Sequence, residues 1–224
     1  MDWEALWLTA RLAGLVAAIL LLVSLPLAYW ITFSRRRWTF LVESVVSLPL
    51  VLPPTVLGFY LLVSFGARSP LGQFWMAWTG RSLAFTFEGL VVASLIYSLP
   101  FAVQPVAAAF SQVDPTLREA SATLGASPLR TFMRIVLPLS KQGVLTGVIL
   151  SFAHTVGEFG VVLMVGGNLP GVTRTVSISI YDQVQTLQYA EANRTALFLL
   201  AFSFTVLLVV HGLRRRPLAA APMA

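Results

Sequence analysis

Two ionisable side chains stand together in one apolar stretch of the chain, His154 and Glu158 in the segment HTVGE. Residues four apart share one face of a helix, so we expect the imidazole and the carboxyl group to lie on the same side. The pair lacks the second histidine of a zinc-binding HExxH motif, and no nucleophile or metal-ligand set accompanies it, which argues against an enzyme. A bare carboxylate there would repel an anion, so we expect Glu158 to pair with backbone or with His154.

Prolines inside apolar segments form a second group of residues with structural consequences. Pro49, Pro53 and Pro54 fall within one segment, and each removes a helical hydrogen bond and clashes with the preceding turn. A break inside a membrane must face protein or a water-filled cavity, as in many transporters. The alternative is a kinked structural helix. If the break faces a cavity, it could line a path through the membrane or a gate in that path. The candidate lining residues are Pro49, Pro53, Pro54, Thr55, Gln104, His154 and Glu158.

The composition places these residues in a membrane protein. Of 224 residues, 57% are hydrophobic and only 11% are charged, whereas soluble domains carry about 25% charged residues. The absence of cysteine excludes disulfides and cysteine-based metal sites. A net charge of +6 reflects the arginine bias of membrane loops, so we expect no nucleic acid partner. The length predicts one domain, residues 1–224.

Five segments are long and apolar enough to cross a bilayer, which takes about 20 residues. They cover residues 12–33, 41–65, 89–110, 143–166 and 196–213. We therefore predict an all-α, polytopic bundle of about five transmembrane helices. The start MDWEALW has no basic residue before its apolar run, so we expect the first span to be retained rather than cleaved. Residues 167–195 could hold a further short or re-entrant helix around VSISIYDQVQTL.

The distribution of basic residues predicts the orientation. Ten fall on one side of the predicted spans, and four, Arg68, Arg81, Arg174 and Arg194, fall on the other. The ten are Arg35, Arg36, Arg37, Arg118, Arg130, Arg134, Lys141, Arg214, Arg215 and Arg216. The richer side is expected to be cytoplasmic. This places the N-terminus outside the cell and the C-terminus, with residues 114–138, inside.

Residues 114–138 contain two helix starts of the same design. Asp114-Pro115 and Ser127-Pro128 each combine a side-chain cap with a proline at the first helical position. Gly125 separates two predicted short helices, and the second continues to Pro138 with Arg130 and Arg134 on one face. The pattern favours a compact protrusion with Glu119 early in its first helix. The alternative, an amphipathic helix lying on lipid headgroups, needs neither the glycine nor two caps.

The same stretch resembles the EAA motif of ABC importer membrane subunits. The matching residues are Glu119, Ala120, Gly125, Ile135, Leu137 and Pro138, and the one departure is Ser121, where the motif has alanine. The resemblance implies that this EAA loop (residues 114–138) docks in a groove of a cytoplasmic ATPase. Glu119 and Gly125 would then shape the loop. Contact residues would be neighbours such as Ala120, Ser121, Ala126, Arg130 and Pro138.

A separate chain is expected to bind the nucleotide. A P-loop needs a lysine after a glycine-rich turn to hold the terminal phosphates. Lys141, in LSKQG, is the one lysine of the sequence and cannot supply that loop. We therefore expect ATP and Mg²⁺ on a partner ATPase and no cofactor on this chain.

Two further segments narrow the resemblance to molybdate permease subunits, relatives of the sulfate permeases. They are SLPLVLPPTVLGFYLLVSFG (47–66) and HTVGEFGVVLMVGGNLPGVTRT (154–175), and the likeness covers about residues 35–213. It implies ATP-driven import of molybdate or tungstate across the bacterial inner membrane. Expected partners are a second copy of the chain, two ATPase subunits, an extracytoplasmic oxyanion-binding protein and membrane lipid. No Arg or Lys falls mid-span, which fits selection of the anion by the binding protein.

Three alternatives stay open at this point. A sulfate or thiosulfate ABC permease would share most of these features, because the oxyanions are close in size and charge. An amino-acid or sugar permease of the same superfamily is opposed only by the segments 47–66 and 154–175. An ATPase-independent anion channel or secondary transporter would need intramembrane charges for coupling and no docking loop, which is the reverse of what the sequence has.

Overall fold

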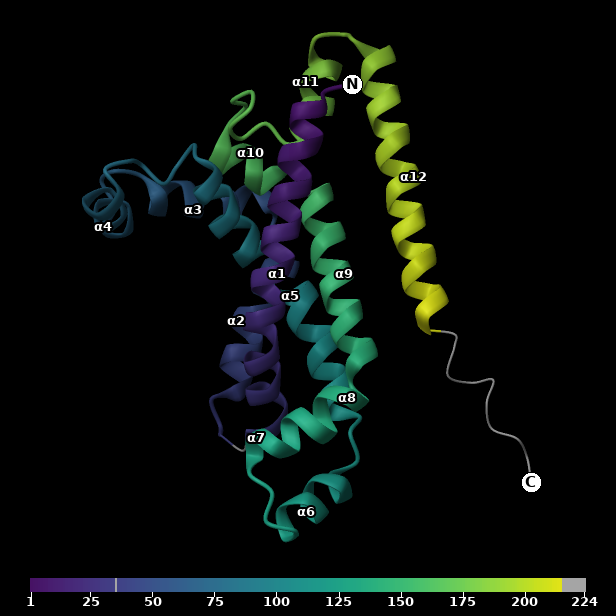
Figure 1. Ribbon diagram of the computed structural model, residues 1–224. Helices are drawn as coiled ribbons and strands as arrows, with labels where there is room; N and C mark the ends of the chain where they lie inside the picture. The colour runs from purple at the N-terminus through teal and green to yellow at the C-terminus, as the bar shows by residue number, and fades with distance from the viewer. Residues whose placement is uncertain (35, 215–224) are drawn as a thin grey trace.

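Three helices pack along one another at the centre of the molecule: α1 (Trp3–Phe33), α5 (Phe87–Ser111) and α9 (Lys141–Gly157) (Figure 1). The computed structural model describes residues 1–34 and 36–214. Arg35, Arg215 and Arg216 of the predicted cytoplasmic set, and the end of the predicted domain 1–224, lie outside the described residues. Buried apolar side chains of α1 and α5, among them Leu12, Leu90 and Phe110, form much of the core, whereas the buried residues of α9 are mostly small or polar, such as Gly147 and Ser151.

The described residues contain helices and no strand, which confirms the predicted helical bundle. Three helices, α1, α5 and α12 (Tyr189–Arg214), are long and apolar enough to cross a membrane alone. Two bent pairs raise the count to as many as five. Helix α1 begins nine residues before the predicted span of 12–33, because Asp2 caps it by accepting a hydrogen bond from the Ala5 N–H at 3.0 Å.

The predicted break in the second span is confirmed. Helices α2 (Thr39–Val51) and α3 (Pro54–Phe65) meet at an angle of 112°. Leu52 and Pro53 lie in extended conformations between them, and Pro54 is the first residue of α3, where its missing N–H costs nothing. Pro49 lies inside α2 without ending it, so the bend comes from the later pair of prolines.

The fourth span differs from the predicted continuous helix over 143–166. Helix α9 ends at Gly157 and α10 (Gly160–Gly166) begins after two non-helical residues. Glu158 follows the helix in an extended conformation, so the prediction that it shares a helical face with His154 is wrong. Glycine at 157 and 160 weakens the helix at this place. A Cβ on Gly160 would lie 2.7 Å from the Pro54 Cβ, so this glycine also allows the start of α10 to contact the start of α3.

Short helices fill the connections between the spans. Helix α11 (Val176–Gln185) resolves the question that the sequence left open, since residues 167–195 do hold a short helix. Helix α4 (Pro70–Thr79) was not predicted, although Ser69-Pro70 is the same kind of start signal as Asp114-Pro115 and Ser69 caps the Gly72 N–H at 2.8 Å. Helices α6 (Pro115–Thr123), α7 (Pro128–Thr131) and α8 (Leu137–Leu139), with the π-helical segment η1 (Phe132–Val136) between α7 and α8, form the EAA loop at one end of the bundle (Figure 1).

Two glycines bring α9 into close contact with α5. A Cβ on Gly143 would lie 2.2 Å from the Ala109 Cβ, and one on Gly147 would lie 2.8 Å from the Ala102 carbonyl oxygen. The spacing of four residues places both glycines on one face of α9, which is the small-residue pattern that lets membrane helices approach closely. Residues 143–157 are thereby held tightly against the centre of the bundle.

Candidate functional site

The EAA loop is built by local capping interactions that the sequence predicts. Asp114 Oδ1 accepts hydrogen bonds from the Thr116 N–H at 2.9 Å and the Thr116 hydroxyl at 2.8 Å, and these bonds lower the pKa of the Asp114 carboxyl. Ser127 caps α7 by accepting from the Arg130 N–H at 3.3 Å. The two predicted helix starts and the intervening turn are confirmed.

Gly125 provides the turn between the two helices. Its φ of +76° lies in the left-handed region, which costs glycine little and other residues more. The Ala126 N–H donates to the Ser121 carbonyl at 3.0 Å, and the Gly125 N–H donates to the Ala122 carbonyl at 2.9 Å. This pair of bonds is the Schellman arrangement that ends a helix and satisfies its last carbonyls. The geometry explains why the motif has glycine at this position.

Ser121, the one departure from the EAA motif, links the two helices of the loop. Its hydroxyl lies 2.8 Å from the Thr131 hydroxyl, and both side chains are buried. Ser121 therefore faces inward rather than toward a docking partner. Thr131 was missed by the sequence analysis, because nothing in the local pattern shows that residues 121 and 131 meet.

The second helix of the loop is less regular than predicted. Arg130 belongs to α7, whereas Arg134 lies in η1, where the Leu137 N–H donates to the Phe132 carbonyl five residues back. Pro138 does not end the helix, which continues to Leu139. A proline inside a helix lacks an N–H and crowds the carbonyl four residues earlier, and a wider turn relieves both problems.

Glu119 lies in the middle of α6 rather than in its first turn, so it is farther from the positive end of the helix than predicted. It is exposed, as are Ala120, Gly125, Arg130 and Pro138, while Ala126 is half-buried. Large apolar side chains share this surface, with Leu124 87% exposed and Leu129 70% exposed. An exposed apolar patch with charged neighbours is the kind of surface that another protein covers.

A second candidate region lies where the two breaks meet, at the end of α9 that is farther from the EAA loop. A cavity of about 540 Å³ is lined by Pro54, Thr55, Tyr97, His154 and Glu158, together with Ala153 and residues around Gly160. Of the predicted path residues, Pro54, Thr55, His154 and Glu158 are thus brought together. We call this space the break cavity, and none of its described lining residues is Lys or Arg.

His154 is fixed in the break cavity by a chain of hydroxyl groups. Its Nδ1 lies 2.9 Å from the Ser98 hydroxyl, which lies 2.9 Å from the Thr155 hydroxyl, and Thr155 donates to the Ser151 carbonyl. Because Thr155 uses its one proton on that carbonyl, it accepts from Ser98, and the Ser98 oxygen accepts from Nδ1. The neutral imidazole therefore carries its proton on Nδ1. Its ring also stacks on Phe101 with the centroids 3.9 Å apart.

Glu158 lacks the backbone or His154 partner that its sequence context predicts. The residue is 3% exposed, and neither carboxyl oxygen has a hydrogen-bond partner within the described part of the chain. The hydroxyl of Ser94 is also buried and lies beside the Glu158 carboxyl group, but the two do not form a hydrogen bond of normal geometry. Buried polar atoms without partners are uncommon and mark places where structure and function compete. The expectation that Glu158 pairs with backbone or with His154 is wrong for this arrangement.

Gln104 lies apart from the break cavity. Its side-chain amide donates to the Ser47 hydroxyl at 3.1 Å and lines a separate cavity of about 400 Å³ together with Glu43. Pro49 is buried within α2, and Pro53 stands at the bend itself. The predicted path residues therefore belong to two separate regions, the break cavity and the cavity beside Gln104. The bent pair α2 and α3 connects the two regions.

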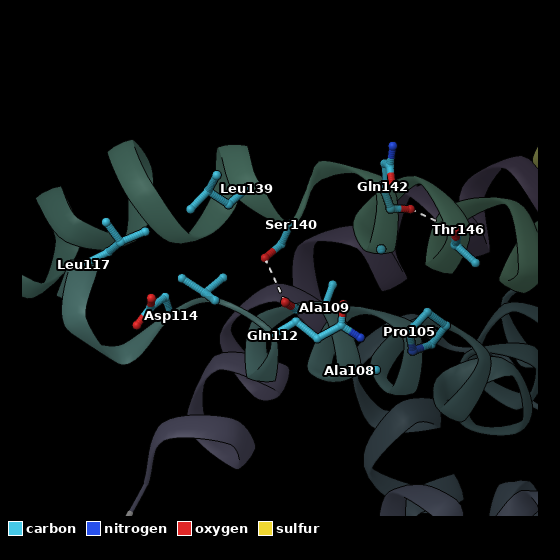
Figure 2. Close-up of a pocket in the computed structure, with 12 residues that line it drawn as sticks. Pro105, Ala108, Ala109, Gln112, Asp114, Leu117, Leu139, Ser140, Gln142 and Thr146 are labelled. Carbon is cyan, nitrogen blue, oxygen red and sulfur yellow. Dashed lines mark hydrogen bonds between the residues drawn. The ribbon is translucent and has the colours of Figure 1, made fainter. Parts of the chain in front are cut away.

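A third cavity, of about 500 Å³, opens where α5 ends and the EAA loop begins (Figure 2). Gln112, Asp114, Gln142 and Thr146 give it a polar lining, and Ser140 donates to the Ala109 carbonyl at 3.3 Å across it. No motif in the sequence marks these glutamines. Their polarity next to an apolar span was the only local signal.

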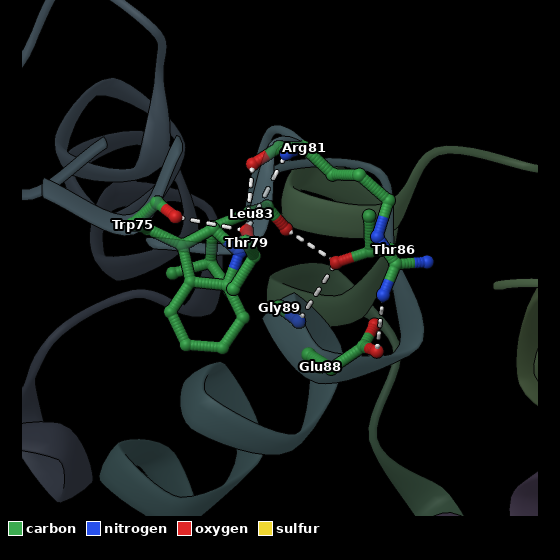
Figure 3. Close-up of polar contacts among 7 residues, drawn as sticks. All are labelled: Trp75, Thr79, Arg81, Leu83, Thr86, Glu88 and Gly89. Atoms are coloured by element: carbon green, nitrogen blue, oxygen red, sulfur yellow. Dashed lines mark hydrogen bonds and ion pairs between the residues drawn. The ribbon is translucent and has the colours of Figure 1, made fainter. Parts of the chain in front are cut away.

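At the opposite end of the bundle a set of polar contacts fixes the turn between α4 and α5 (Figure 3). The Thr86 hydroxyl accepts from the Gly89 N–H at 3.1 Å, and Arg81 pairs with Glu88 at 3.5 Å. Between them Phe85 has a φ of +64°, and its N–H donates to the Val165 carbonyl at 2.9 Å. The turn before α5 is thus held against α10.

Comparisons with known proteins agree with this architecture. Residues 12–216 match the family described as binding-protein-dependent transport system inner membrane component. The chain is 50% identical over 214 residues to the molybdenum transport system permease protein ModB of Azotobacter vinelandii, covering 96% of this chain and 95% of that one. It is 36% identical to ModB of Escherichia coli K12, covering 96% and 94%. The sulfate transport system permease protein CysT of Salmonella typhimurium is 34% identical, covering 92% of this chain and 74% of that one.

Solved structures with the same fold include a bacterial ABC transporter involved in the import of the acidic polysaccharide alginate, with a TM-score of 0.77, 19% identity, and coverage of 96% of this chain and 79% of that one. The MetNI methionine ABC transporter in an inward-facing conformation has a TM-score of 0.72 at 17% identity, with coverage of 96% and 95%. At these identities the likeness concerns the fold. Together with the family match and the full-length relatives, it shows that the chain belongs to the multi-pass inner membrane permeases of ABC transporters, in the molybdenum transport permease family.

Proposed function

We propose that this chain forms the membrane path of an ATP-driven importer of molybdate or tungstate. The observation that carries the proposal is the 50% identity to a molybdenum permease over nearly the full length of both chains. The two break segments and the EAA loop carry most of the predicted functional residues, and all three lie inside the matched region 12–216.

The proposal includes the remaining subunits, which the architecture supports. A single copy supplies three to five spans, which suit one wall of a path better than a closed pore, so two copies line it together. The exposed Leu124, Leu129 and Arg130 of the EAA loop suit docking to an ATPase, two copies of which serve the dimer. In this arrangement the EAA loop is cytoplasmic, the N-terminus lies outside the cell, and an extracytoplasmic binding protein delivers the anion.

The break cavity suits a gate rather than a tight binding site. A site that holds a tetrahedral dianion strongly uses arginine, lysine or several N–H donors, and none of the described residues lining the break cavity is cationic. Selection of the anion then belongs to the binding protein, and the permease opens and closes.

The sulfate relative supports the second candidate. The chain is 34% identical to a sulfate permease, and sulfate has the shape and charge of molybdate. The lower identity and the 74% coverage of that relative favour molybdate.

An uptake experiment separates these candidates. The chain is purified with its ATPase and binding protein, reconstituted in vesicles, and supplied with radiolabelled molybdate, tungstate or sulfate. We expect ATP-dependent uptake of labelled molybdate that unlabelled tungstate competes and an equal concentration of sulfate does not. Uptake of sulfate at an equal rate would favour the sulfate permease, and equal molybdate uptake with and without ATP would contradict the importer altogether.

A further inference from the structure

An arginine of the EAA loop is tied to the end of the first span. The guanidinium carbon of Arg118, in α6, lies 3.7 Å from the centre of the Phe33 ring, the last residue of α1. A cation within about 6 Å of a ring face is attracted to it, and the attraction grows when water is excluded. Phe33 is half-buried, so part of the water is excluded on its side of the contact.

Phe33 belongs to a group of four rings where three elements meet. Its ring centre lies 4.9 Å from that of Tyr29 and 6.4 Å from that of Phe110. The Phe132 ring completes the group at 5.3 Å from Tyr29 and 5.9 Å from Phe110. Tyr29 and Phe33 come from α1, Phe110 from α5 and Phe132 from η1. Arg118 therefore connects α6 to a junction of both spans and the second half of the EAA loop.

The Arg118–Phe33 contact adds to the hydrogen bond that links the two helices of the EAA loop. Ser121 bonds to Thr131 of α7 at 2.8 Å, and Arg118, three residues earlier on the same face of α6, reaches α1. One face of α6 is thus attached to two different elements, while Leu124 at its end and Glu119 stay exposed. With the Ser121 contact alone, α6 could turn about Gly125 without moving α1.

We propose that Arg118 is a positioning residue that passes movements of α6 to the first span through the ring of Phe33. This inference rests on the proposed function, because it requires an ATPase that moves α6. When α6 shifts, the guanidinium group carries Phe33 and the end of α1 with it. When the contact is absent, α6 moves against α7 alone and ATP is hydrolysed with less import.

The test measures ATP hydrolysis and anion uptake together, in vesicles holding the complete transporter. Arg118→Ala and Phe33→Leu are each expected to lower the uptake per ATP by about twofold to thirtyfold, the range that a cation–aromatic contact supports. Phe33→Trp should keep the wild-type ratio, because the indole face binds cations best. The double variant should be no worse than the more severe single variant. The control is Arg37→Ala, an exposed arginine at the same end of the bundle.

Three results would overturn the inference: an unchanged ratio in Arg118→Ala, additive losses in the double variant, or a normal ratio in Phe33→Leu while Arg118→Ala is impaired. The last result would mean that Arg118 contacts the ATPase directly. Failure of the proposed function has a different signature, since wild type itself would then show no ATP-dependent uptake.

Discussion

Gly125 allows a prediction whose size follows from the backbone alone. Its φ is +76°, and a Cβ added there would meet nothing within 4 Å. An L-residue in this conformation costs about 1–2 kcal/mol, and the stiffer unfolded chain of an alanine variant returns about 0.4–1 kcal/mol. We therefore expect Gly125→Ala to destabilise the turn by up to about 1.5 kcal/mol, which lowers the equilibrium constant for the docking-competent loop by up to about tenfold.

Two further variants at this position should bracket alanine. Gly125→Asn should lose less, because asparagine tolerates the left-handed region. Gly125→Pro should lose about 3 kcal/mol or more, since proline fixes φ near −65° and removes the N–H that bonds to Ala122. The matched control is Gly14→Ala in α1, where an added Cβ also meets nothing within 4 Å and φ is not positive.

The assay is co-purification of the ATPase with the tagged permease from detergent-solubilised membranes, together with coupled uptake. The expected order of retained ATPase is Gly14→Ala equal to wild type, then Gly125→Asn, Gly125→Ala and Gly125→Pro, with similar amounts of inserted permease throughout. If Gly125→Pro retains both the ATPase and transport, the EAA loop is not the coupling element and the reasoning fails.

Three other predictions concern the packing, the candidate carboxyl groups and pH. Gly143→Leu should force α9 away from Ala109 and destabilise the permease by about 1–3 kcal/mol, seen as a lower melting temperature in detergent. Glu158→Gln should keep uptake within about twofold of wild type, because the amide has nearly the same shape as the carboxyl group. Glu119→Lys should reduce uptake about tenfold, which corresponds to about 1.4 kcal/mol of docking free energy. The reverse order would mean that transport depends on the carboxyl group of the break cavity rather than on that of the EAA loop. The pKa of Asp114 is lowered by its bonds to Thr116. Its cap therefore stabilises α6 fully at a pH above the ordinary aspartate pKa, and this stabilisation is lost as the pH falls through the lowered pKa of the folded protein. The hydrogen-exchange rates in the first turn of α6 should differ between wild type and Asp114→Asn at about pH 6 and become similar near about pH 3. A difference that persists at low pH would contradict this role of the cap.

What the sequence predicts well depends on local chemistry. The caps at Asp114 and Ser127, the turn at Gly125 and the bend at Pro53 each follow from the conformational limits of a few neighbouring residues, and the structure has all four. The EAA motif also lies within one short stretch of the chain, so the sequence alone indicates the family.

What the sequence does not predict depends on contacts between distant residues. Just after the end of α9 at Gly157, Gly160 contacts Pro54, which lies about 100 residues earlier in the chain. The hydrophobic periodicity of the sequence does not indicate this contact. The Ser121–Thr131 bond and the Arg118–Phe33 contact are of the same kind. The grouping of Thr55, His154 and Glu158 around one cavity also needs the three-dimensional arrangement, because different elements contribute.

The same contacts determine where a movement of the EAA loop would be absorbed. Helix α8 joins α9 at Ser140, where the chain bends by 73° and the Ser140 hydroxyl donates to the Ala109 carbonyl of α5. Along α9 the close contacts of Gly143 and Gly147 with α5 leave no room for sliding, and no proline interrupts the helix before Gly157. We therefore expect a displacement at residue 140 to pass along α9 to Gly157, after which the two non-helical residues are the first break in the helix. Because α10 is held against α3 there, a bend at this break changes the shape of the break cavity and the bend at Pro53 together.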